Sequence, residues 1–289
     1  MSNKYVVVTA VRDEEKYLQK TYESVSTQTI LPEEWVIVND GSSDRTGELI
    51  DGYTRVHPWI QMVHLGNRGY RKAGAGVVEA FYEGYGALKT KKFDFIVKLD
   101  GDLMFEKDYF ENCFRKFQDR PNLGIGGGVI YHWADGGVYE LEETPRFHVR
   151  GATKIYRKAC WDAIGGMRRL TGWDTIDEVK ANMLGWETES FSDLRLIQLR
   201  KTGMAYGIWG NNVKNGMANN IIGYHPLFML FKCIRRLFKK PFIIGSIGLM
   251  YGYLLGYIKR VEREEDNDFK KYIRGQQIRR LTFRDSIWK

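Results

Sequence analysis

The sequence has few cysteines and no paired cysteine motif. Only three occur in 289 residues, at Cys113, Cys160 and Cys233, and none belongs to a CxxC pair. This spacing argues against a disulfide framework and against a structural zinc site. The segment MSNKYVVVTAVRDEE at the start also lacks the long apolar run of a secretory signal. We therefore expect a cytoplasmic protein.

Excess positive charge is absent from most of the chain. The net charge is +8, yet residues 216–289 alone hold fifteen Lys or Arg and six Asp or Glu, so residues 1–215 carry about −1. Enzymes of nucleic acids place basic charge around the active cleft, so we expect no nucleic-acid partner. The basic segment is rich in apolar and aromatic residues, which favours an anionic membrane surface as partner.

The chain is long enough for one large α/β domain with an appendage, and 43% of its residues are hydrophobic. Short β-branched runs alternate with helical periodicity, which indicates βαβ units and a mostly parallel sheet. The Gly-rich residues 121–170 predict further strands and loops that close over a site. The predicted strands are 4–10, 35–40, 60–65, 93–100 and 192–199, and the predicted helices are 14–27, one following the loop that begins at 41, 73–89 and 176–184.

Polar clusters follow three of these strands: RDEE at 12–15, NDGSSD at 39–44 and DGD at 100–102. Ligands of open α/β sheets bind outside the carboxyl ends of the strands. Asp100 and Asp102 offer hard oxygen ligands for Mg²⁺ or Mn²⁺, and such a cation neutralises a diphosphate leaving group. Taken singly, each cluster is also compatible with a turn and a helix cap.

In combination, these segments resemble the inverting family 2 glycosyltransferases over about the first 210 residues. The matching segments are VVVTAVRDEEKYL, ESVSTQT, WVIVNDGSSDRT, the NRG of 67–69 and FIVKLDGDL, in the family's order and approximate spacing. The resemblance implies a GT-A fold, a UDP- or GDP-sugar donor and a divalent cation, Mn²⁺ or Mg²⁺.

The resemblance also implies roles for particular residues. By position, Thr9 and Glu14 match the first nucleotide-contacting loop, and Asp40 matches the base-binding aspartate. Asp100 and Asp102 match the Asp-x-Asp motif, in which the second aspartate is the usual metal ligand.

The first loop departs from the family pattern, which puts its detailed geometry in doubt. Ala10 stands where the family usually has Pro, and Arg12 and Asp13 replace a usual Tyr-Asn pair. Arg71 and Lys72 are candidates for diphosphate contacts or for a solvated loop.

An acceptor hydroxyl is a poor nucleophile until a base removes its proton. In the resembled family this base is an acidic residue that opens a helix, with a Gly-aromatic pair about eleven residues later. Asp174 precedes Gly185-Trp186 by that distance, and Asp177, one turn further on, is the second candidate. The family's commoner pattern is Glu-Asp, whereas this chain has Trp173 before Asp174. His148 lies where the family chain passes near the donor sugar, and a structural role is the alternative.

The basic tail has two apolar parts. Residues 226–240 carry five Lys or Arg among Leu, Phe and Met, a pattern typical of an interfacial amphipathic helix. Residues 241–258 lack charge and include glycines at four-residue or similar intervals, which suit close helix packing. Three arrangements remain open for 241–258: an interfacial or re-entrant hairpin, helices docked on the catalytic domain, or a membrane span.

The sequence therefore predicts a GT-A domain at residues 1–215 and a membrane-associating helical tail at 216–289. The expected reaction is inverting transfer of a sugar to a lipid-linked, saccharide or other membrane-proximal acceptor at the inner face of the cell membrane. A nucleotidyltransferase is an alternative, but it would favour a basic Gly-rich loop where RDEE stands. A non-enzymatic membrane scaffold with a degenerate site is a second alternative, and the carboxylates at 40, 102 and 174 argue against it.

Overall fold

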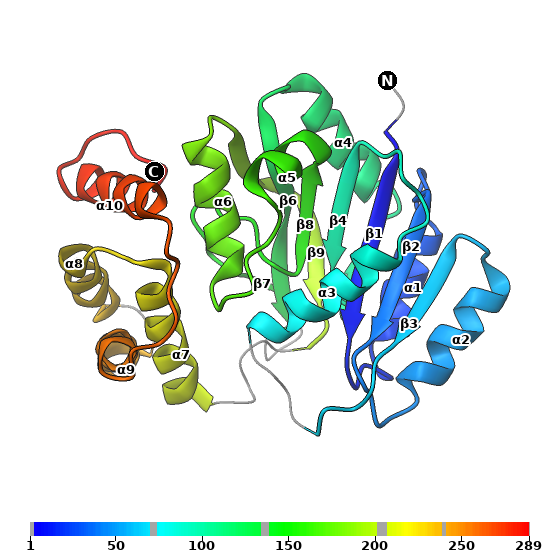
Figure 1. Cartoon of the computed structure of the whole chain (residues 1–289), viewed down its shortest axis with the longest axis horizontal. Coiled ribbons are helices and arrows are strands. Elements are labelled where there is room, and N and C mark those ends of the chain that lie inside the picture. Colours follow the sequence, from blue (N-terminus) through cyan, green and yellow to red (C-terminus); the bar gives the residue numbers. More distant parts are fainter. Residues whose placement is uncertain (1–2, 70–73, 134–138, 201–206, 239–240, 289) are drawn as a thin grey trace.

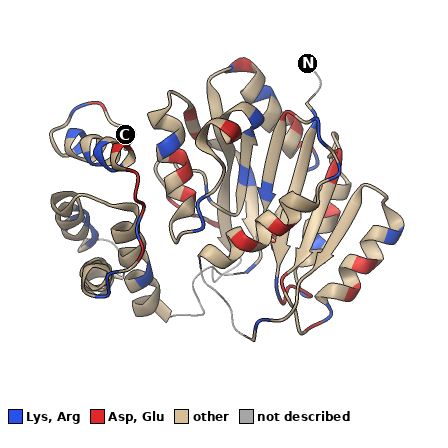
Figure 2. Ribbon diagram, in the orientation of Figure 1, with Lys and Arg blue, Asp and Glu red and all other residues tan. Residues whose placement is uncertain are grey.

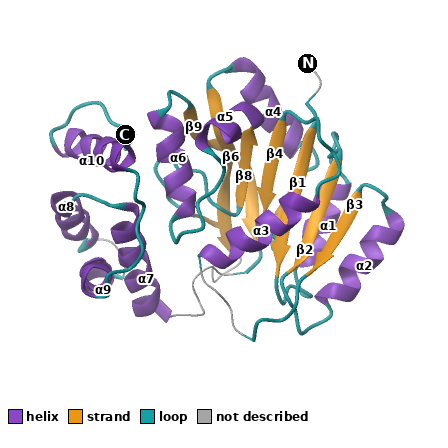
Figure 3. Cartoon of the chain, in the orientation of Figure 1, coloured by secondary structure: helices purple, strands orange, loops and turns teal. Residues whose placement is uncertain are grey.

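The computed structural model describes residues 3–69, 74–133, 139–200, 207–238 and 241–288. Within them, helices cover both faces of one sheet, and a group of further helices lies beside it (Figures 1 and 3). The strands are β1 Tyr5–Val11, β2 Glu34–Asn39, β3 Ile60–His64, β4 Phe95–Leu99, β5 Leu103–Phe105, β6 Leu123–Trp133, β7 Tyr139–Leu141, β8 Thr153–Arg157 and β9 Glu187–Gln198. The helices are α1 Leu18–Ser26, α2 Thr46–Val56, α3 Ala75–Ala87, α4 Tyr109–Asp119, α5 Lys158–Ile164, α6 Trp173–Met183, α7 Gly207–Ile222, α8 Pro226–Arg236, α9 Phe242–Ile258 and α10 Asn267–Leu281.

The sheet runs in the order β3-β2-β1-β4-β8-β6-β9-β5, with β7 paired to β6. The first four of these strands are parallel, as the βαβ pattern predicts. The apolar runs of β1, β2 and β4 are buried on both faces, as is usual for parallel strands between helices, whereas the edge strand β3 buries only Ile60. The glycine-rich segment then adds β8 antiparallel to β4 and to β6, so the whole sheet is more mixed than the sequence predicts.

Several elements begin elsewhere than predicted. Helix α1 begins at Leu18 rather than at residue 14, because the residues from Glu14 to Tyr17 form a turn with Tyr17 N donating to Glu14 O at 3.0 Å. Helix α6 begins at Trp173, three residues before the predicted start, and α5 lies in a segment predicted as strands and loops.

Two hydrophobic clusters hold the helices on the sheet. Helices α1, α2 and α4 pack on one face through side chains such as Leu18, Ile50 and Phe114. Helices α3, α5 and α6 pack on the other, through side chains such as Phe81 and Trp161. The loops at the carboxyl ends of the parallel strands are thereby held between two covered faces.

The tail helices join the domain through a third cluster. Ile176 and Val179, on the side of α6 away from the sheet, pack with apolar residues of α7, α8, α9 and α10 (Figure 1). The predicted boundary between 215 and 216 falls inside α7, since this helix begins at Gly207. The composition change at Gly216 marks where apolar stretches begin, and it does not mark a break in the backbone.

Helices α7 and α9 meet backbone to backbone. A Cβ atom added to Gly252 would lie 2.0 Å from the carbonyl oxygen of Val213, and one added to Gly216 would lie 2.0 Å from that of Leu249. Only glycine permits this approach, so the small-residue face of α9 packs against α7 within the same chain. Among the described residues, no helix combines the length and the hydropathy needed to cross a membrane, and α9 has 17 residues.

Candidate functional site

The predicted polar clusters meet at one edge of the sheet. The backbone N–H of Asp40, at the end of β2, donates to the carbonyl of Val11 in β1 at 2.8 Å. The loop after β1 is tied to the loop after β2, since Asp13 accepts from Ser43 N and Glu14 N donates to Thr46 Oγ1, each at 2.8 Å. Parallel strands place their carboxyl ends at the same edge, which is where ligands of such sheets bind.

Asp40 is paired with Arg68, the arginine of the NRG segment at 67–69. Both carboxylate oxygens accept from Arg68 Nη2, at 2.7 and 2.5 Å. Arg68 Nη1 also lies 3.3 Å from Glu79 Oε2 on α3. The Asn67–Gly69 segment thus places a cation over the predicted base-binding aspartate. Arg71 and Lys72 lie outside the described residues.

Of the two aspartates in the Asp-x-Asp motif, Asp102 is the more buried, with 3% of its surface exposed. Burial raises its pKa to about 7, and the nearby Asp100 carboxylate adds to the rise. Gln198 Nε2, at the end of β9, donates to Asp102 Oδ2 at 3.2 Å. Gly101 is required between the two aspartates, because a Cβ atom there would lie 2.4 Å from Val11 Cγ1.

Arg200 joins two of the predicted residues. Its guanidinium donates from Nη2 to Glu14 Oε1, and its Nε lies 3.7 Å from Asp102 Oδ2. Glu14 is buried, and its other oxygen, Oε2, has no hydrogen-bond partner. The structure therefore places one cation between the first loop and the Asp-x-Asp motif. Sequence reasoning missed Arg200 because only the fold brings this residue, just after β9, to the loops that follow β1 and β4.

The side chain of Thr9 is buried in the sheet rather than exposed at the strand end. It lies in the middle of β1 with no exposed surface, and its hydroxyl accepts from Trp35 Nε1 at 2.9 Å. The resemblance assigned it to the first loop, but the strand continues to Val11, and the Thr9 side chain contacts Trp35 of the neighbouring strand β2.

The two candidate bases differ sharply in their surroundings. Asp177 is 1% exposed, and its carboxylate accepts from Lys154 Nζ at 2.7 Å and from the Tyr156 hydroxyl at 2.5 Å. Burial raises the pKa of Asp177 to about 7 against the opposing effect of Lys154, and the like charge of Glu178 adds to the rise. Such a carboxylate is enclosed by protein groups and has no free face for an acceptor.

Asp174, by contrast, is only half-buried in the first turn of α6. Burial alone would raise its pKa, yet the positive charges of His148, Lys154 and Arg150 hold the pKa of Asp174 below the usual value. Asp174 is thus the more accessible of the two carboxylates, whereas the oxygens of Asp177 already accept from Lys154 and Tyr156.

His148 has a structural environment. Its Nδ1 lies 2.8 Å from Glu178 Oε2, and the other oxygen of Glu178 accepts from Val149 N at 2.7 Å. Burial would lower the pKa of His148, but the carboxylate of Glu178 raises it above the usual value. The imidazole therefore fixes the chain against α6.

The residues at the strand ends fit a divalent cation of the kind that keeps several non-protein ligands. Within the described part of the chain, no three His, Cys, Asp or Glu side chains gather into a metal-binding group. Mg²⁺ is commonly held by one or two carboxylates together with water and substrate phosphates. Asp100 and Asp102 supply such a pair, and a cation held by them would offset the burial of Asp102 and its repulsion by Asp100, the two causes that raise its pKa.

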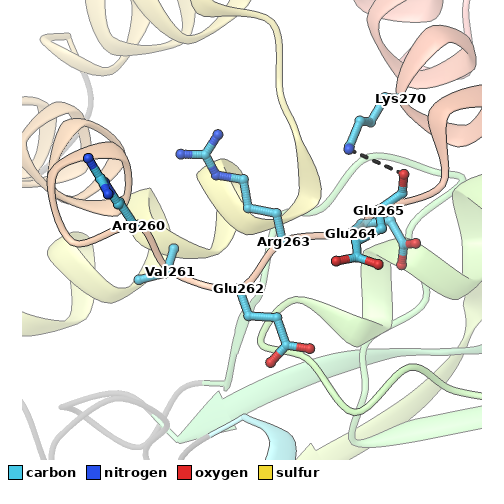
Figure 4. Close-up of a pocket in the computed structure, with 7 residues that line it drawn as sticks. All are labelled: Arg260, Val261, Glu262, Arg263, Glu264, Glu265 and Lys270. Atoms are coloured by element: carbon cyan, nitrogen blue, oxygen red, sulfur yellow. Dashed lines mark hydrogen bonds between the residues drawn. The ribbon is translucent and has the colours of Figure 1, made fainter.

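A separate hollow of about 340 Å³ follows the loop between α9 and α10 (Figure 4). Cations and carboxylates alternate along it, and Lys270 Nζ donates to the carbonyl of Glu265 at 3.3 Å. None of the predicted site residues lines this hollow. The lining residues are Arg260, Val261, Glu262, Arg263, Glu264, Glu265 and Lys270.

The sheet is parallel over its first four strands and mixed beyond them, and solved structures confirm the predicted GT-A fold. The mannosyltransferase PcManGT from Pyrobaculum calidifontis, in complex with GDP-Man and Mn²⁺, superposes with a TM-score of 0.56 at 14% identity, covering 96% of this chain and 86% of that one. Residues 1–349 of TarS from S. aureus, in complex with UDP-GlcNAc, give a TM-score of 0.55 at 15% identity, covering 96% and 81% of the two chains.

The chain belongs to glycosyl transferase family 2, whose family model matches residues 6–170. Two curated relatives come from Streptococcus pneumoniae serotype 4. Glycosyltransferase GlyA is 27% identical over 160 residues, which cover 54% of this chain and 20% of GlyA. Glycosyltransferase GlyG is 26% identical over 140 residues, which cover 48% of this chain and 44% of GlyG. The chain thus spans less than half the length of either relative.

Proposed function

We propose that this protein transfers a sugar from a UDP- or GDP-sugar to an acceptor hydroxyl with inversion at the anomeric carbon. One observation carries the proposal. Asp40 and Asp102, each beside an arginine, lie at the carboxyl ends of parallel strands, and Asp174 offers a partly open, ionised carboxylate at the start of α6. A nucleotide diphosphate matches the first group, and a hydroxyl that must lose its proton matches the second.

The strand-end residues would hold the donor. Asp40 would accept from the base or ribose, while Arg68 limits how far the Asp40 carboxylate can move. Asp102 and Asp100 would hold Mn²⁺ or Mg²⁺, which neutralises negative charge on a diphosphate leaving group. Arg200 would add a second positive charge beside that diphosphate, since its guanidinium already lies between Glu14 and Asp102.

Asp174 would act as the general base. Its carboxylate is partly exposed in the first turn of α6, where an acceptor hydroxyl could approach it and lose its proton to it. Attack on the sugar face opposite the diphosphate inverts the anomeric centre, by the same geometric logic as in inverting glycosidases. Asp177 would not take part in proton transfer, because Lys154 and Tyr156 occupy its oxygens.

The first test of this proposal is the cation dependence of nucleotide binding. We expect UDP or GDP to bind measurably only with Mn²⁺ or Mg²⁺, because the carboxylate pair would otherwise repel the diphosphate. Asp102→Asn should abolish this dependence, as measured by titration calorimetry with and without a chelator. Equal binding of both nucleotides in the two conditions would contradict the assignment of the Asp-x-Asp motif.

We also propose that the acceptor is lipid-linked or otherwise near a membrane, in the synthesis of a polysaccharide at the inner face of the cell membrane. The support is an exposed apolar surface on the tail helices, which we call the tail surface. Of the 23 exposed large hydrophobic residues in the described part of the chain, sixteen lie between positions 208 and 258. Figure 2 shows that α7, α8 and α9 carry few charged residues along most of their length. The sixteen are Ile208, Trp209, Leu227, Leu230, Phe231, Ile234, Leu237, Phe238, Phe242, Ile243, Ile244, Ile247, Tyr251, Leu254, Tyr257 and Ile258.

The arrangement of α9 explains why this surface is apolar. Gly248, Gly252 and Gly256 face α7, and the large side chains at 243, 247, 251, 254 and 258 recur at three- or four-residue intervals on the outer side. Helix α8 presents the same spacing at 227, 231 and 234, and Phe238 follows two residues after the helix ends. Basic residues flank both stripes, with Arg235 exposed on α8 and Lys259 and Arg260 exposed after α9. An apolar stripe flanked by cations matches an anionic lipid surface.

A further inference from the structure

Two buried lysines stand side by side beneath the candidate site. Lys98 on β4 and Lys154 on β8 are direct cross-strand partners, with 3% and 0% of their surfaces exposed. Lysine is almost never fully buried unless it is paired, and like charges opposite each other on neighbouring strands repel. Their ammonium groups therefore need several anionic or polar contacts each.

Each lysine holds a different half of the site. Lys98 Nζ donates to Asp100 Oδ1 of the Asp-x-Asp motif and to the carbonyl of Gly151 at 2.5 Å. Lys154 Nζ lies 2.7 Å from Asp177 Oδ1 and 2.8 Å from Glu178 Oε1 on α6. It also donates to the backbone carbonyl of Asp174. Lys98 thus holds the Asp-x-Asp motif through Asp100, and Lys154 holds the first turn of α6, which contains Asp174.

Trp173 lies over both ammonium groups. The Nζ atoms of Lys98 and Lys154 are 5.5 and 5.4 Å from its ring centroid, within the range of cation–π attraction. Trp173 is the first residue of α6, directly before Asp174, and is 6% exposed. Its ring is fixed further by Gly151, where an added Cβ atom would lie 2.9 Å from Cζ2.

We propose that Trp173 is a positioning residue, which uses its contacts with Lys98 and Lys154 to fix Asp174 relative to the Asp-x-Asp carboxylates. This rests on the proposed function, in which Asp174 is the base. The indole contacts both lysines, so the distance between the Asp-x-Asp carboxylates and the Asp174 carboxylate would stay constant. Trp173 stands where the family commonly has an acidic residue before the base, and here it would hold Asp174 in position.

The test is Trp173→Leu, which keeps an apolar side chain but removes the ring face. We expect kcat to fall roughly 10²-fold, the effect of a misplacement of about 1 Å at a reacting group. The KM for donor, and the Kd for UDP or GDP with Mn²⁺, should stay within about threefold, because Asp40 and Asp102 keep their contacts. Trp173→Phe, which retains a ring face, should restore most of kcat.

Trp161 on α5 provides the matched control. It is 4% exposed and belongs to the same hydrophobic cluster, but its ring contacts are with aromatic residues of α3 and β8. Trp161→Leu should lower the melting temperature while kcat stays within about threefold of wild type. Equal losses of kcat in the two leucine variants, or a Trp173→Phe variant as impaired as Trp173→Leu, would overturn the positioning role.

A second variant covers the case in which Trp173→Leu does not fold. Lys154→Met combined with Asp177→Asn removes a positive and a negative charge together and frees the carbonyl of Asp174. This variant should show the same loss of kcat with donor binding retained, and wild-type kcat would refute the proposal. Asp174→Asn, measured in parallel, separates the two failures. If it keeps full turnover, the base assignment fails; if it loses turnover while the two positioning variants do not, only the positioning role fails.

Discussion

Asp174→Asn is expected to keep nucleotide affinity near the wild-type value and to lower turnover by roughly 10² or more, as for a lost general base. The amide has the shape of the carboxylate but cannot take the proton of the acceptor hydroxyl. Binding should survive because the strand-end residues that would hold the donor lie on β2, β4 and their loops. The measurement is kcat for sugar transfer together with the Kd for UDP or GDP in the presence of Mn²⁺.

Asp177→Asn is the matched control, one turn further along α6, and its effect should fall on stability. Lys154 would lose one of its two carboxylate partners while it stays fully buried. Removing one partner of a buried ion pair costs about 3–5 kcal/mol of folding free energy, so the melting temperature should fall clearly. If Asp177→Asn lost turnover at an unchanged melting temperature and Asp174→Asn did not, the base would lie at Asp177.

The sequence predicts the first half of the sheet well, for a physical reason. Parallel strands such as β1 and β2 are buried on both faces, so they appear as continuous β-branched runs, and the helices between them repeat at 3.6 residues. The polar clusters that interrupt these runs mark the strand ends. The meeting of RDEE, NDGSSD and DGD at one edge is therefore predictable from local pattern together with the handedness of βαβ units.

The long-range pairs of the site are not predictable in this way. Arg200 reaches Glu14 across 186 positions of the chain, and nothing in the local pattern around either residue indicates the other. The same holds for Lys98 and Lys154, which meet only because β8 returns antiparallel to β4. Strand order after the fourth strand depends on the whole packing of the domain.

The choice between Asp174 and Asp177 also depends on tertiary contacts that the local sequence pattern does not predict. Both residues lie in the first turns of one amphipathic helix, and their spacing places them on nearby faces. Which of them is enclosed depends on Lys154 and Tyr156, which come from the neighbouring strand β8. Sequence reasoning therefore yields two candidates, and the tertiary contacts of β8 separate them.

The full-length protein is expected to co-sediment with anionic liposomes through the tail surface. Truncation near Asn215 is a poor test, because α7 continues to Ile222 and a cut there would also expose Ile176 and Val179 of α6. Substitutions of exposed side chains avoid this damage. Phe231, Ile247 and Leu254 are each about half exposed on α8 and α9, so changing them to Ser should leave the packed faces intact.

The triple serine variant should bind anionic liposomes roughly 10²-fold more weakly. Full burial of a large apolar side chain contributes about 1.5–3 kcal/mol, and half of that for each of three residues gives at least about 2–3 kcal/mol. A second variant, with Arg235, Lys259 and Arg260 changed to Gln, should weaken binding by about 1 kcal/mol per removed charge. Its remaining affinity should depend less on salt than that of the wild type, because fewer cations face the lipid.

The matched control carries serine at Leu31, Val56 and Met62, which are exposed apolar residues of the catalytic domain. It should bind liposomes like the wild type, and all variants should bind UDP or GDP equally, since Asp40 and Asp102 are unchanged. Neutral liposomes should retain less protein than anionic ones, because the flanking cations then contribute nothing. If the full chain binds no liposomes of any composition, the proposal that the tail surface binds a membrane is wrong. If it also sediments as a dimer that the triple serine variant turns into monomers, the tail surface joins two copies of this chain and the acceptor need not be near a membrane.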